Sequence, residues 1–464
     1  MRHDDGEAGG EAGFNSLKNK DSYLGGYHAW LNWALGTAFV IVVFVMQSGY
    51  AITNKEMAFD LSLTLTQVGL VGSVYTWVFA IAQICSGSML DQLGTRKCLP
   101  LAVIVLSLGA FVFSRANGVE MLIAGQVLMA LGASFGFIGA GFIGGQWFAP
   151  IHYGFMFALV QFAASIGALL GQRAISSLLG VYGVHWSELI GGIALCGAVV
   201  AIGMFFLLRD PPKAEGTREG WKGFHAFIDG ILNSVSTVAA IRASWINTLI
   251  GGATFGSLFA IGVVWGPRLL QAGGMEVSDT HSVTSLCWMG LALGAPIFSY
   301  LSEKVGRTVI VMGGACLLQI VSVVAMLALS DSSVSVASVA FFLFGFGAGG
   351  SMLPYAIAAK LVPVSLVGTS AALVNAVQFV TGGLLMAIPG NILSGASNVV
   401  AGQAVHNPTL VDYQTALVVI PAFLTAAFIL CFFLHEPGSC NQKKQVEKER
   451  KAIDRAMSAN QHHS

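Results

Sequence analysis

Long apolar runs separated by short polar segments dominate the chain. A bilayer core about 30 Å thick needs roughly 20 apolar residues per helix, and twelve runs of about this length can be counted. They lie near 29–52, 66–90, 98–114, 119–145, 151–179, 186–208, 243–268, 280–302, 308–329, 335–359, 364–391 and 414–434. The pattern predicts an all-α membrane protein with twelve transmembrane helices.

Composition supports a membrane protein and argues against several other classes. Hydrophobic residues make up 55% of the chain and charged residues 10%, and mean hydropathy is +0.74, too apolar for an ordinary soluble domain. The seven cysteines form no CxxC pair, so no disulfide framework or metal site is indicated. No nucleophile–base pair or phosphate loop is present. We expect neither an enzyme nor a nucleic-acid partner, and no cofactor except a proton as a coupling ion.

The positions of Lys and Arg predict the orientation. Nineteen of these residues fall on the side that holds both termini, and four fall on the opposite side or within the spans. The positive-inside rule then places both termini in the cytoplasm. The chain has no Asn-x-Ser/Thr acceptor with a permitted middle residue. These features favour a bacterial inner membrane.

A short charged motif interrupts the apolar runs twice, at an offset of 212 residues. Each copy has an acid, a Gly three positions later and a base after it. The first copy comprises Asp91, Gly94, Arg96 and Lys97, and the second comprises Glu303, Lys304, Gly306 and Arg307. Gly154 and Gly368 match at an offset of 214, and Gly132 and Gly345 match at 213. Such a constant offset predicts two six-helix halves related as a parallel repeat.

This repeat divides the chain into five predicted segments. They are a polar cytoplasmic tail at 1–27, an N-terminal bundle at 28–208, a linker at 209–242, a C-terminal bundle at 243–434 and a basic cytoplasmic tail at 435–464. Within the linker, Trp221, Phe224, Ile228 and Ile231 recur at helical spacing. We expect an amphipathic helix lying on the membrane surface, and the alternative is a solvated linker.

The twelve spans and the doubled motif resemble the major facilitator superfamily of secondary transporters. The resemblance covers residues 28–434 and implies alternating access by two bundles that rock about a central site. The run Gln146-Trp147-Phe148 and Leu343-Phe-Gly-Phe are similar to the phagosomal nutrient transporter branch of intracellular bacteria. That branch is associated with uptake of amino acids, nucleosides or siderophores. Many superfamily members carry an arginine in span four where this chain has Gln126.

The charged motif suggests how one side of the protein closes. Repeat symmetry places Asp91 beside the start of span eleven and Glu303 beside the start of span five. A carboxylate near a helix N-terminus is stabilised by about 0.3–1 kcal/mol. We expect the two acids to act as cytoplasmic latches, with Arg96 and Arg307 paired to them and the glycines permitting tight turns. The alternative is that the bases are only positive-inside anchors.

Polar groups within the spans are the candidates for a binding site. Gln161 in span five and Asn375 in span eleven are repeat mates, and Gln378 shares a helix face with Asn375. The alternative role for these amides is to hold helices together. Arg173 is the one charged residue well inside a span, and it either binds an anionic group or pairs with Glu188. Predicted depth also selects four aromatic residues, for each of which core or lipid-facing packing is the alternative: Tyr75, Trp77, Trp288 and Tyr355.

These features predict a monomeric transporter in the lipid bilayer that takes up a small polar or anionic solute. The solute classes implied by the resemblance are amino acids, nucleosides, organic acids and carboxylate siderophores. A sensor or receptor on a transporter scaffold, or a proton-linked exporter, is the alternative. No Asp or Glu lies in the middle of a span, which argues against proton-linked export.

Overall fold

Within the residues that the computed structural model describes, twelve helical spans are long and apolar enough to cross a membrane. The described residues are 25–211, 224–331, 333–396, 399–400, 403–404 and 408–435. The first six spans are α2 (Tyr27–Asp60), α3 (Leu65–Leu93), α4 (Thr95–Ser114), α5 (Val119–Ala133) with α6 (Gly136–Trp147), α7 (Tyr153–Gly180) and α8 (Trp186–Leu207). The last six are α10 (Arg242–Ala260) with α11 (Gly266–Ala272), α12 (Val277–Val305), α13 (Thr308–Ala328), α14 (Val334–Ala348) with α15 (Leu353–Leu361), α16 (Val367–Ala396) and α17 (Leu410–Leu417) with α18 (Val419–Cys431). The predicted number of spans is confirmed.

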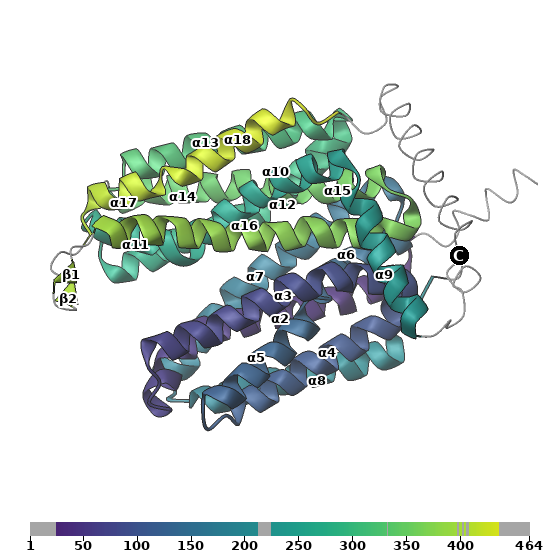
Figure 1. The fold of residues 1–464 in the computed structure, drawn as a ribbon, viewed down its shortest axis with the longest axis horizontal. Coiled ribbons are helices and arrows are strands. Elements are labelled where there is room, and N and C mark those ends of the chain that lie inside the picture. Colours follow the sequence, from purple (N-terminus) through teal and green to yellow (C-terminus); the bar gives the residue numbers. More distant parts are fainter. Residues whose placement is uncertain are drawn as a thin grey trace, which may run out of the picture.

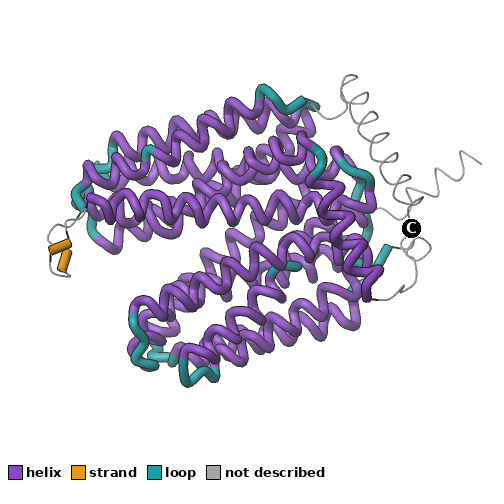
Figure 2. The backbone as a smooth tube through the Cα atoms, viewed as in Figure 1, coloured by secondary structure: helices purple, strands orange, loops and turns teal. Residues whose placement is uncertain are grey.

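The spans form two bundles, one from α2 to α8 and the other from α10 to α18 (Figure 1). Two helix pairs make the main contacts between the bundles, α3 with α16 and α7 with α12. These pairs correspond to each other under the sequence repeat. The ribbons of α3 and α16 converge at the end that carries Asp91 and diverge toward the opposite end (Figure 2). We call these the motif end and the far end.

Glycines at matching places in the two halves let helices approach closely. A methyl group at Gly132 would overlap the backbone carbonyl oxygen of Ala102, and one at Gly345 would overlap that of Cys287. Span four is interrupted after Ala133, and span ten is interrupted by a 3-10 turn at Gly349–Met352. Such close approach is typical of membrane helices, which associate through small residues. The repeat is therefore present in the packing as well as in the sequence.

Apolar side chains cover the outside of the bundles. On α4, Leu101, Ile104, Leu108 and Phe111 are 61%, 49%, 51% and 51% exposed. Their spacing of three and four residues places them on one face of the helix. An apolar stripe of this kind would be costly in water. It is the surface expected of a helix that faces lipid, so the protein is an integral membrane protein.

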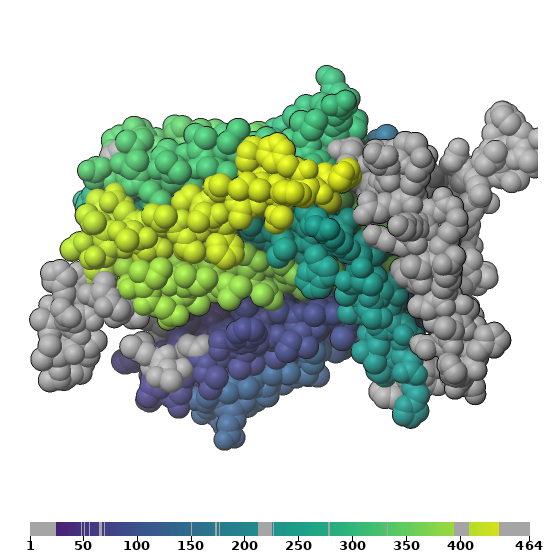
Figure 3. All heavy atoms as spheres, turned by 45° about the horizontal axis from the view of Figure 1, so that its top comes forward, coloured from purple at the N-terminus to yellow at the C-terminus, as the bar shows by residue number. Residues whose placement is uncertain are grey.

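The helix α9 (Phe224–Ala239) lies at the motif end and connects the bundles (Figure 3). It contacts α3, α10 and α16. Ile231 and Val238 are buried on its inner side, whereas Leu232 is 61% exposed. Trp221 of the predicted amphipathic stripe lies outside the described residues. A short antiparallel hairpin, β1 (Val399–Val400) and β2 (Gln403–Ala404), follows α16 and is the one addition to the expected all-α fold within the described residues.

Candidate functional site

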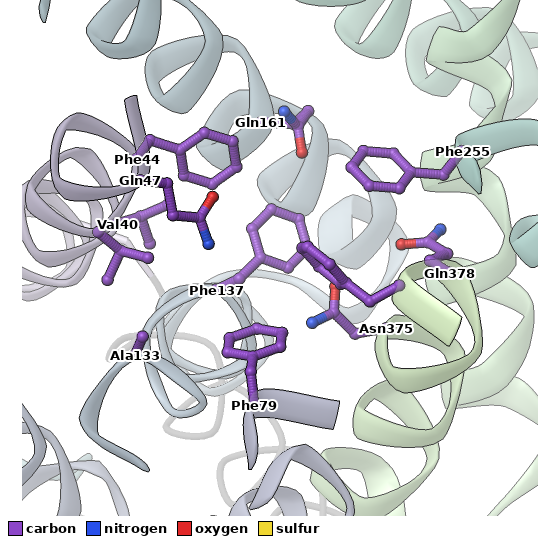
Figure 4. Close-up of a pocket in the computed structure, with 12 residues that line it drawn as sticks. Val40, Phe44, Gln47, Phe79, Ala133, Phe137, Gln161, Phe255, Asn375 and Gln378 are labelled. Carbon is purple, nitrogen blue, oxygen red and sulfur yellow. The ribbon is translucent and has the colours of Figure 1, made fainter. Parts of the chain in front are cut away.

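A small chamber of about 20 Å³, with room for about one water molecule in this conformation, lies between the two halves. Its walls come from α2, α3, α5, α6 and α7 on one side and from α10 and α16 on the other (Figure 4). The lining residues are Val40, Val43, Phe44, Gln47, Phe79, Ala133, Phe137, Gln161, Phe255, Asn375, Gln378 and Phe379. A mostly apolar cavity with a few convergent polar groups is the usual form of a small-molecule site.

Three of the predicted binding residues line this chamber. Gln161 projects from α7, and Asn375 and Gln378 project from α16. Gln161 Nε2 donates to Ser165 Oγ at 3.1 Å, as expected for residues one turn apart on one helix face. Gln378 Nε2 donates to the Ser351 backbone oxygen at 3.0 Å. Gln378 therefore both faces the chamber and holds two helical segments together, so the two roles considered for the amides coexist.

Tyr355 connects the chamber amides to the contact between the halves. Its hydroxyl oxygen lies 2.9 Å from Asn375 Oδ1 and 2.8 Å from Gln378 Oε1, and its single proton is shared between these two acceptors. Its ring stacks on Phe157 of the other half, with centroids 4.5 Å apart and an interplanar angle of 11°. Tyr355 is fully buried. A movement of α16 at the chamber would therefore disturb a contact across the halves.

The other predicted binding residues lie elsewhere. Tyr75 sits one layer behind the wall, where its hydroxyl accepts a hydrogen bond from Gln47 Nε2 at 3.1 Å. Trp288 packs edge-on against Phe259, with centroids 6.4 Å apart, and does not line the chamber. Trp77 is 65% exposed. The position of a residue along a span gives its depth in the membrane but not the direction in which its side chain faces. Depth alone therefore does not identify the residues that line the chamber. Arg173 belongs to α7, but its side chain lies outside what the structure describes.

Asp91 joins the halves at the motif end, where the sequence predicts it. Its Oδ1 accepts from the backbone N–H of Gly368 at 2.9 Å. Its Oδ2 accepts from the backbone N–H and the hydroxyl of Thr369, each at 2.8 Å. Both residues lie in the first turn of α16, where backbone N–H groups have no partner within the helix. The carboxylate thus caps a helix of the opposite half.

Glu303 also reaches the opposite half, but it makes a different contact. Its Oε2 lies 3.1 Å from Nδ1 of His152, in the 3-10 turn just before α7. The Oε1 atom of Glu303 is buried without a hydrogen-bond partner. The predicted position beside span five is confirmed. The predicted capping by backbone N–H groups is absent among the described residues, because a histidine side chain takes that place.

The basic members of the motif do not orient the acids. The ion pairs between described residues join Glu303 to His152 and Asp60 to His185. Arg96 and Arg307 are exposed, as are the neighbouring lysines, so the predicted pairing of these arginines with the acids is wrong. The Arg96 backbone N–H donates to Asp210 Oδ1 at 3.3 Å instead. Basic groups at this position suit a membrane-surface anchor.

The two motif glycines make the expected turns. Gly94 has φ 80°, and Gly306 has φ 68° in the left-handed region. Residues with a Cβ rarely adopt such angles. Lys97 follows the turn at Gly94 and Lys304 precedes the turn at Gly306, and both lysines are exposed. The turns set α3 and α12 so that their acids point toward the other half.

Comparison with known proteins identifies the family. A family model described as Major Facilitator Superfamily matches residues 34–387 and 262–461. The chain belongs to the major facilitator superfamily. It is 24% identical over 420 residues to the probable galactarate/D-glucarate transporter GudP of Bacillus subtilis, covering 83% of this chain and 87% of that protein. It is 20% identical to the uncharacterized transporter YybO of the same organism, covering 78% and 86%.

A second comparison concerns solved structures. The human organic anion transporter MFSD10 (TETRAN) superposes with a TM-score of 0.66 at 13% identity, covering 87% of this chain and 99% of that chain. At this identity the likeness concerns the fold alone. Family membership and the fold together show a major facilitator transporter rather than an enzyme. The relatives do not define its substrate.

A polar cluster of Asp60, His185, Trp186 and Ser187 lies at the far end of the protein, away from the chamber. Asp60 Oδ2 accepts from Trp186 Nε1 and faces His185 Nε2, each at 3.0 Å. The hydrogen bond from Trp186 lowers the pKa of Asp60, assisted by His185 and opposed by partial desolvation. Ser187 N–H donates to His185 Nδ1 at 3.4 Å, which leaves Nε2 as the donor to Asp60. The cluster joins α2 to α8 inside one half, so it stabilises that bundle and does not bridge the two.

Gln47 and the five phenylalanines that line the chamber are not among the binding residues predicted from the sequence. Phenylalanine occurs 30 times in the chain, so its presence in an apolar run does not distinguish a chamber wall from a lipid-facing surface. Gln47 carried a usable signal, because an amide inside an apolar span needs a polar partner. That partner, Tyr75, was itself selected from the sequence.

Proposed function

We propose that this protein moves a small polar solute into a bacterial cell by alternating access. The observation that carries the proposal is the chamber wall, where Gln161 of one half and Asn375 of the other contribute amides to one cavity. The affinity for a solute that binds both amides would depend on the relative position of the two bundles. The contacts of Asp91 and Glu303 hold the motif end closed, and the excess of Lys and Arg there supports a cytoplasmic orientation.

The relatives support a small polar cargo. Their printed names describe probable transporters of galactarate/D-glucarate, of L-galactonate and of sulfoacetate, and a nitrate/nitrite transporter. A single chain supplies both halves of the chamber, which supports a monomeric transporter. A proton as coupling ion is also part of the proposal. The described part of the chamber lining contains no carboxylate, so we place any proton-binding group outside that lining.

Uptake by the purified chain in proteoliposomes tests this proposal. We expect concentrative uptake of one member of a panel of amino acids, neutral solutes and organic acids, and we expect Asn375→Leu to reduce it about tenfold through the loss of one hydrogen bond. An inward proton gradient should increase the rate if the transporter is a proton symporter, whereas an outward gradient would do so for an exporter. Binding of a solute without any flux, in either direction and with either gradient, would favour the sensor and contradict transport.

A further inference from the structure

Among the residues that the structure describes, the chamber lining combines aromatic faces with amide groups and contains no charged side chain. Five of its twelve lining residues are phenylalanines and four are amides. Phe79 of one half meets Phe379 of the other, with centroids 4.8 Å apart and an interplanar angle of 61°. In Figure 4 the amides of Gln47, Gln161 and Asn375 lie around the ring of Phe137. The wall thus offers flat apolar surfaces with hydrogen-bonding groups between them.

The missing charge restricts the solute. A charged group within a membrane protein needs a counter-charge or dense hydrogen bonding. The nearest candidate cation on α7, Arg173, is twelve residues from Gln161 in the chain, or about 18 Å along a helix axis. Phenylalanine faces attract cations, but no carboxylate among the described lining residues is present to neutralise one. An uncharged solute is therefore the best match to this wall.

The hydrogen bonds already made by the amides leave a specific set of groups free. The Tyr355 hydroxyl, with its one proton, lies within hydrogen-bond distance of the oxygens of both Asn375 and Gln378, and the Ser351 backbone oxygen accepts from the Gln378 amide N–H. Asn375 Nδ2 is buried with no partner. On the opposite half, Gln161 uses its Nε2 on Ser165. The chamber therefore presents a donor from α16 and the Gln161 carbonyl oxygen, an acceptor, from α7.

A planar ring with a polar edge satisfies both parts of this wall. Its faces would lie against phenylalanine rings, and stacking on aromatic side chains is worth about 1–3 kcal/mol for a nucleic-acid base. Its edge would accept from Asn375 Nδ2 and donate to the Gln161 oxygen. A polyhydroxylated chain would instead bury hydroxyl groups against phenylalanine, which is unfavourable without partners.

We infer that the chamber binds an uncharged planar ring whose edge carries both a hydrogen-bond donor and an acceptor. The inference rests on the proposed function, because it concerns the cargo of the same chamber. It makes Asn375, Gln161 and Phe379 specificity-determining residues, and it separates this chain from relatives named for sugar acids.

Three probes of nearly equal shape test the role of charge. Nicotinamide is neutral, nicotinate carries a carboxylate, and 1-methylnicotinamide carries a fixed positive charge on its ring nitrogen. Binding to the purified full chain in detergent is measured by equilibrium dialysis, with uracil as a second neutral ring and galactarate as a non-planar dianion. We expect nicotinamide or uracil to bind at least about tenfold more tightly than any charged probe, the effect of one lost hydrogen bond or unpaired group.

Variants locate the binding. Phe379→Leu should weaken binding of the neutral ring about tenfold through lost stacking, and Asn375→Leu should weaken it by a similar factor through lost hydrogen bonding. Phe205→Leu is the matched control, because Phe205 is 67% exposed on α8, and it should bind like the unmodified chain. Thermal denaturation of each variant without ligand verifies that it is folded.

The outcomes separate the cargo from the function. Tighter binding of nicotinate, 1-methylnicotinamide or galactarate than of both neutral rings overturns the inference. Failure of both neutral rings to bind folded protein also overturns it. In either case, uptake of any other solute in proteoliposomes leaves the proposed transport function intact. If no solute of the panel is taken up, the proposed function fails independently of the binding result.

Discussion

Asp91 and Glu303 occupy matching places in the two halves, yet they contact the opposite half through different groups. Asp91 accepts three hydrogen bonds from Gly368 and Thr369. Glu303 meets one half-exposed histidine side chain, His152, and keeps one buried oxygen without a partner. Hydrogen bonds to a partly buried carboxylate are strong, whereas exposed ion pairs contribute about 0–1 kcal/mol. The two latches are therefore symmetric in position and unequal in strength.

The helix start that faces each acid accounts for the difference. Gly368 has no side chain, so α3 approaches closely enough for Asp91 to reach the backbone N–H groups. The repeat mate of Gly368 is Gly154, and it faces Ala356 instead, whose Cβ would lie 2.7 Å from an added methyl group. Duplication thus fixes where an acid lies, and the residues opposite it decide what it binds.

The largest effect should come from Gly87→Ala, which breaks the Asp91 latch sterically. An added methyl group at Gly87 would overlap the Gly368 carbonyl oxygen and lie 2.5 Å from Ala372 Cβ. Backbone atoms cannot move aside without a large cost in free energy, so α3 and α16 should separate at the motif end. We expect uptake to fall by about 150-fold or more, because an overlap with backbone lies at or above the upper end of the 1–3 kcal/mol that overpacking typically costs. Spin-label distances between the two helix ends would measure the separation.

Two control variants sharpen this test. Gly314→Ala in α13 adds the same methyl group where nothing lies within 4 Å. Ser299 holds the place of Gly87 in the second half, at the motif offset of 212, and Ser299→Ala should change uptake little. Normal uptake by Gly87→Ala, or an equal loss in either control, would refute the close contact as the basis of the latch.

Asp91→Asn should have the next largest effect. An amide can accept from one of the two backbone N–H groups, but its own NH₂ would face the remaining donors. Charge-assisted hydrogen bonds are worth about 1.5–3 kcal/mol, so the closed form should lose about 2–3 kcal/mol, or roughly 30- to 150-fold in its population ratio. Uptake should slow while the amount of protein in the membrane stays normal. Unchanged uptake would argue against a latch.

The sequence predicts the scaffold and the Asp91 contact because strong signals specify them. Hydropathy determines the twelve spans, and the acid-Gly-base motif interrupts apolar runs where an accidental charge would be costly. Gln161, Asn375 and Gln378 were found because helical periodicity placed them on polar faces. The histidine opposite Glu303 was not foreseen, because the contact depends on a side chain reaching across a boundary that the repeat does not specify.

The chamber wall could be predicted only in part for a related reason. A phenylalanine gains burial against lipid, a neighbouring helix or a chamber alike, so its type says little about its surroundings. Rotation of each helix about its axis decides among these, and packing against neighbours sets that rotation. Tyr75 and Trp288 do not line the chamber for this reason. An amide, in contrast, indicates which face of its helix is polar.

Glu303→Gln should have a smaller effect than Asp91→Asn. The substitution removes a charge that has one partner, and it also removes a buried unpartnered carboxylate oxygen. The loss of the ion pair destabilises the closed form, and the removal of the buried charge stabilises it. Because the two effects oppose each other, we expect uptake to change by less than about threefold, in line with weak ion pairs. The same proteoliposome assay measures both acids side by side. A loss as large as that of Asp91→Asn would show that the latches are equal in strength.

The smallest expected effect is the coupling between His152 and Glu303 themselves. A double-mutant cycle with His152→Gln and Glu303→Gln isolates their interaction from other effects of each change. The His152 side chain is 51% exposed and that of Glu303 is 19% exposed, so solvent screens the pair and the coupling should be below about 0.5 kcal/mol, or about twofold. A parallel cycle with Asp91→Asn and Thr369→Val should give a larger coupling, because the Thr369 hydroxyl donates to Asp91 in a partly buried contact. Coupling energies come from the spin-label populations of the closed form in each variant. If the histidine pair couples more strongly than the threonine pair, the second half carries the stronger latch and the order proposed for the two acids is reversed.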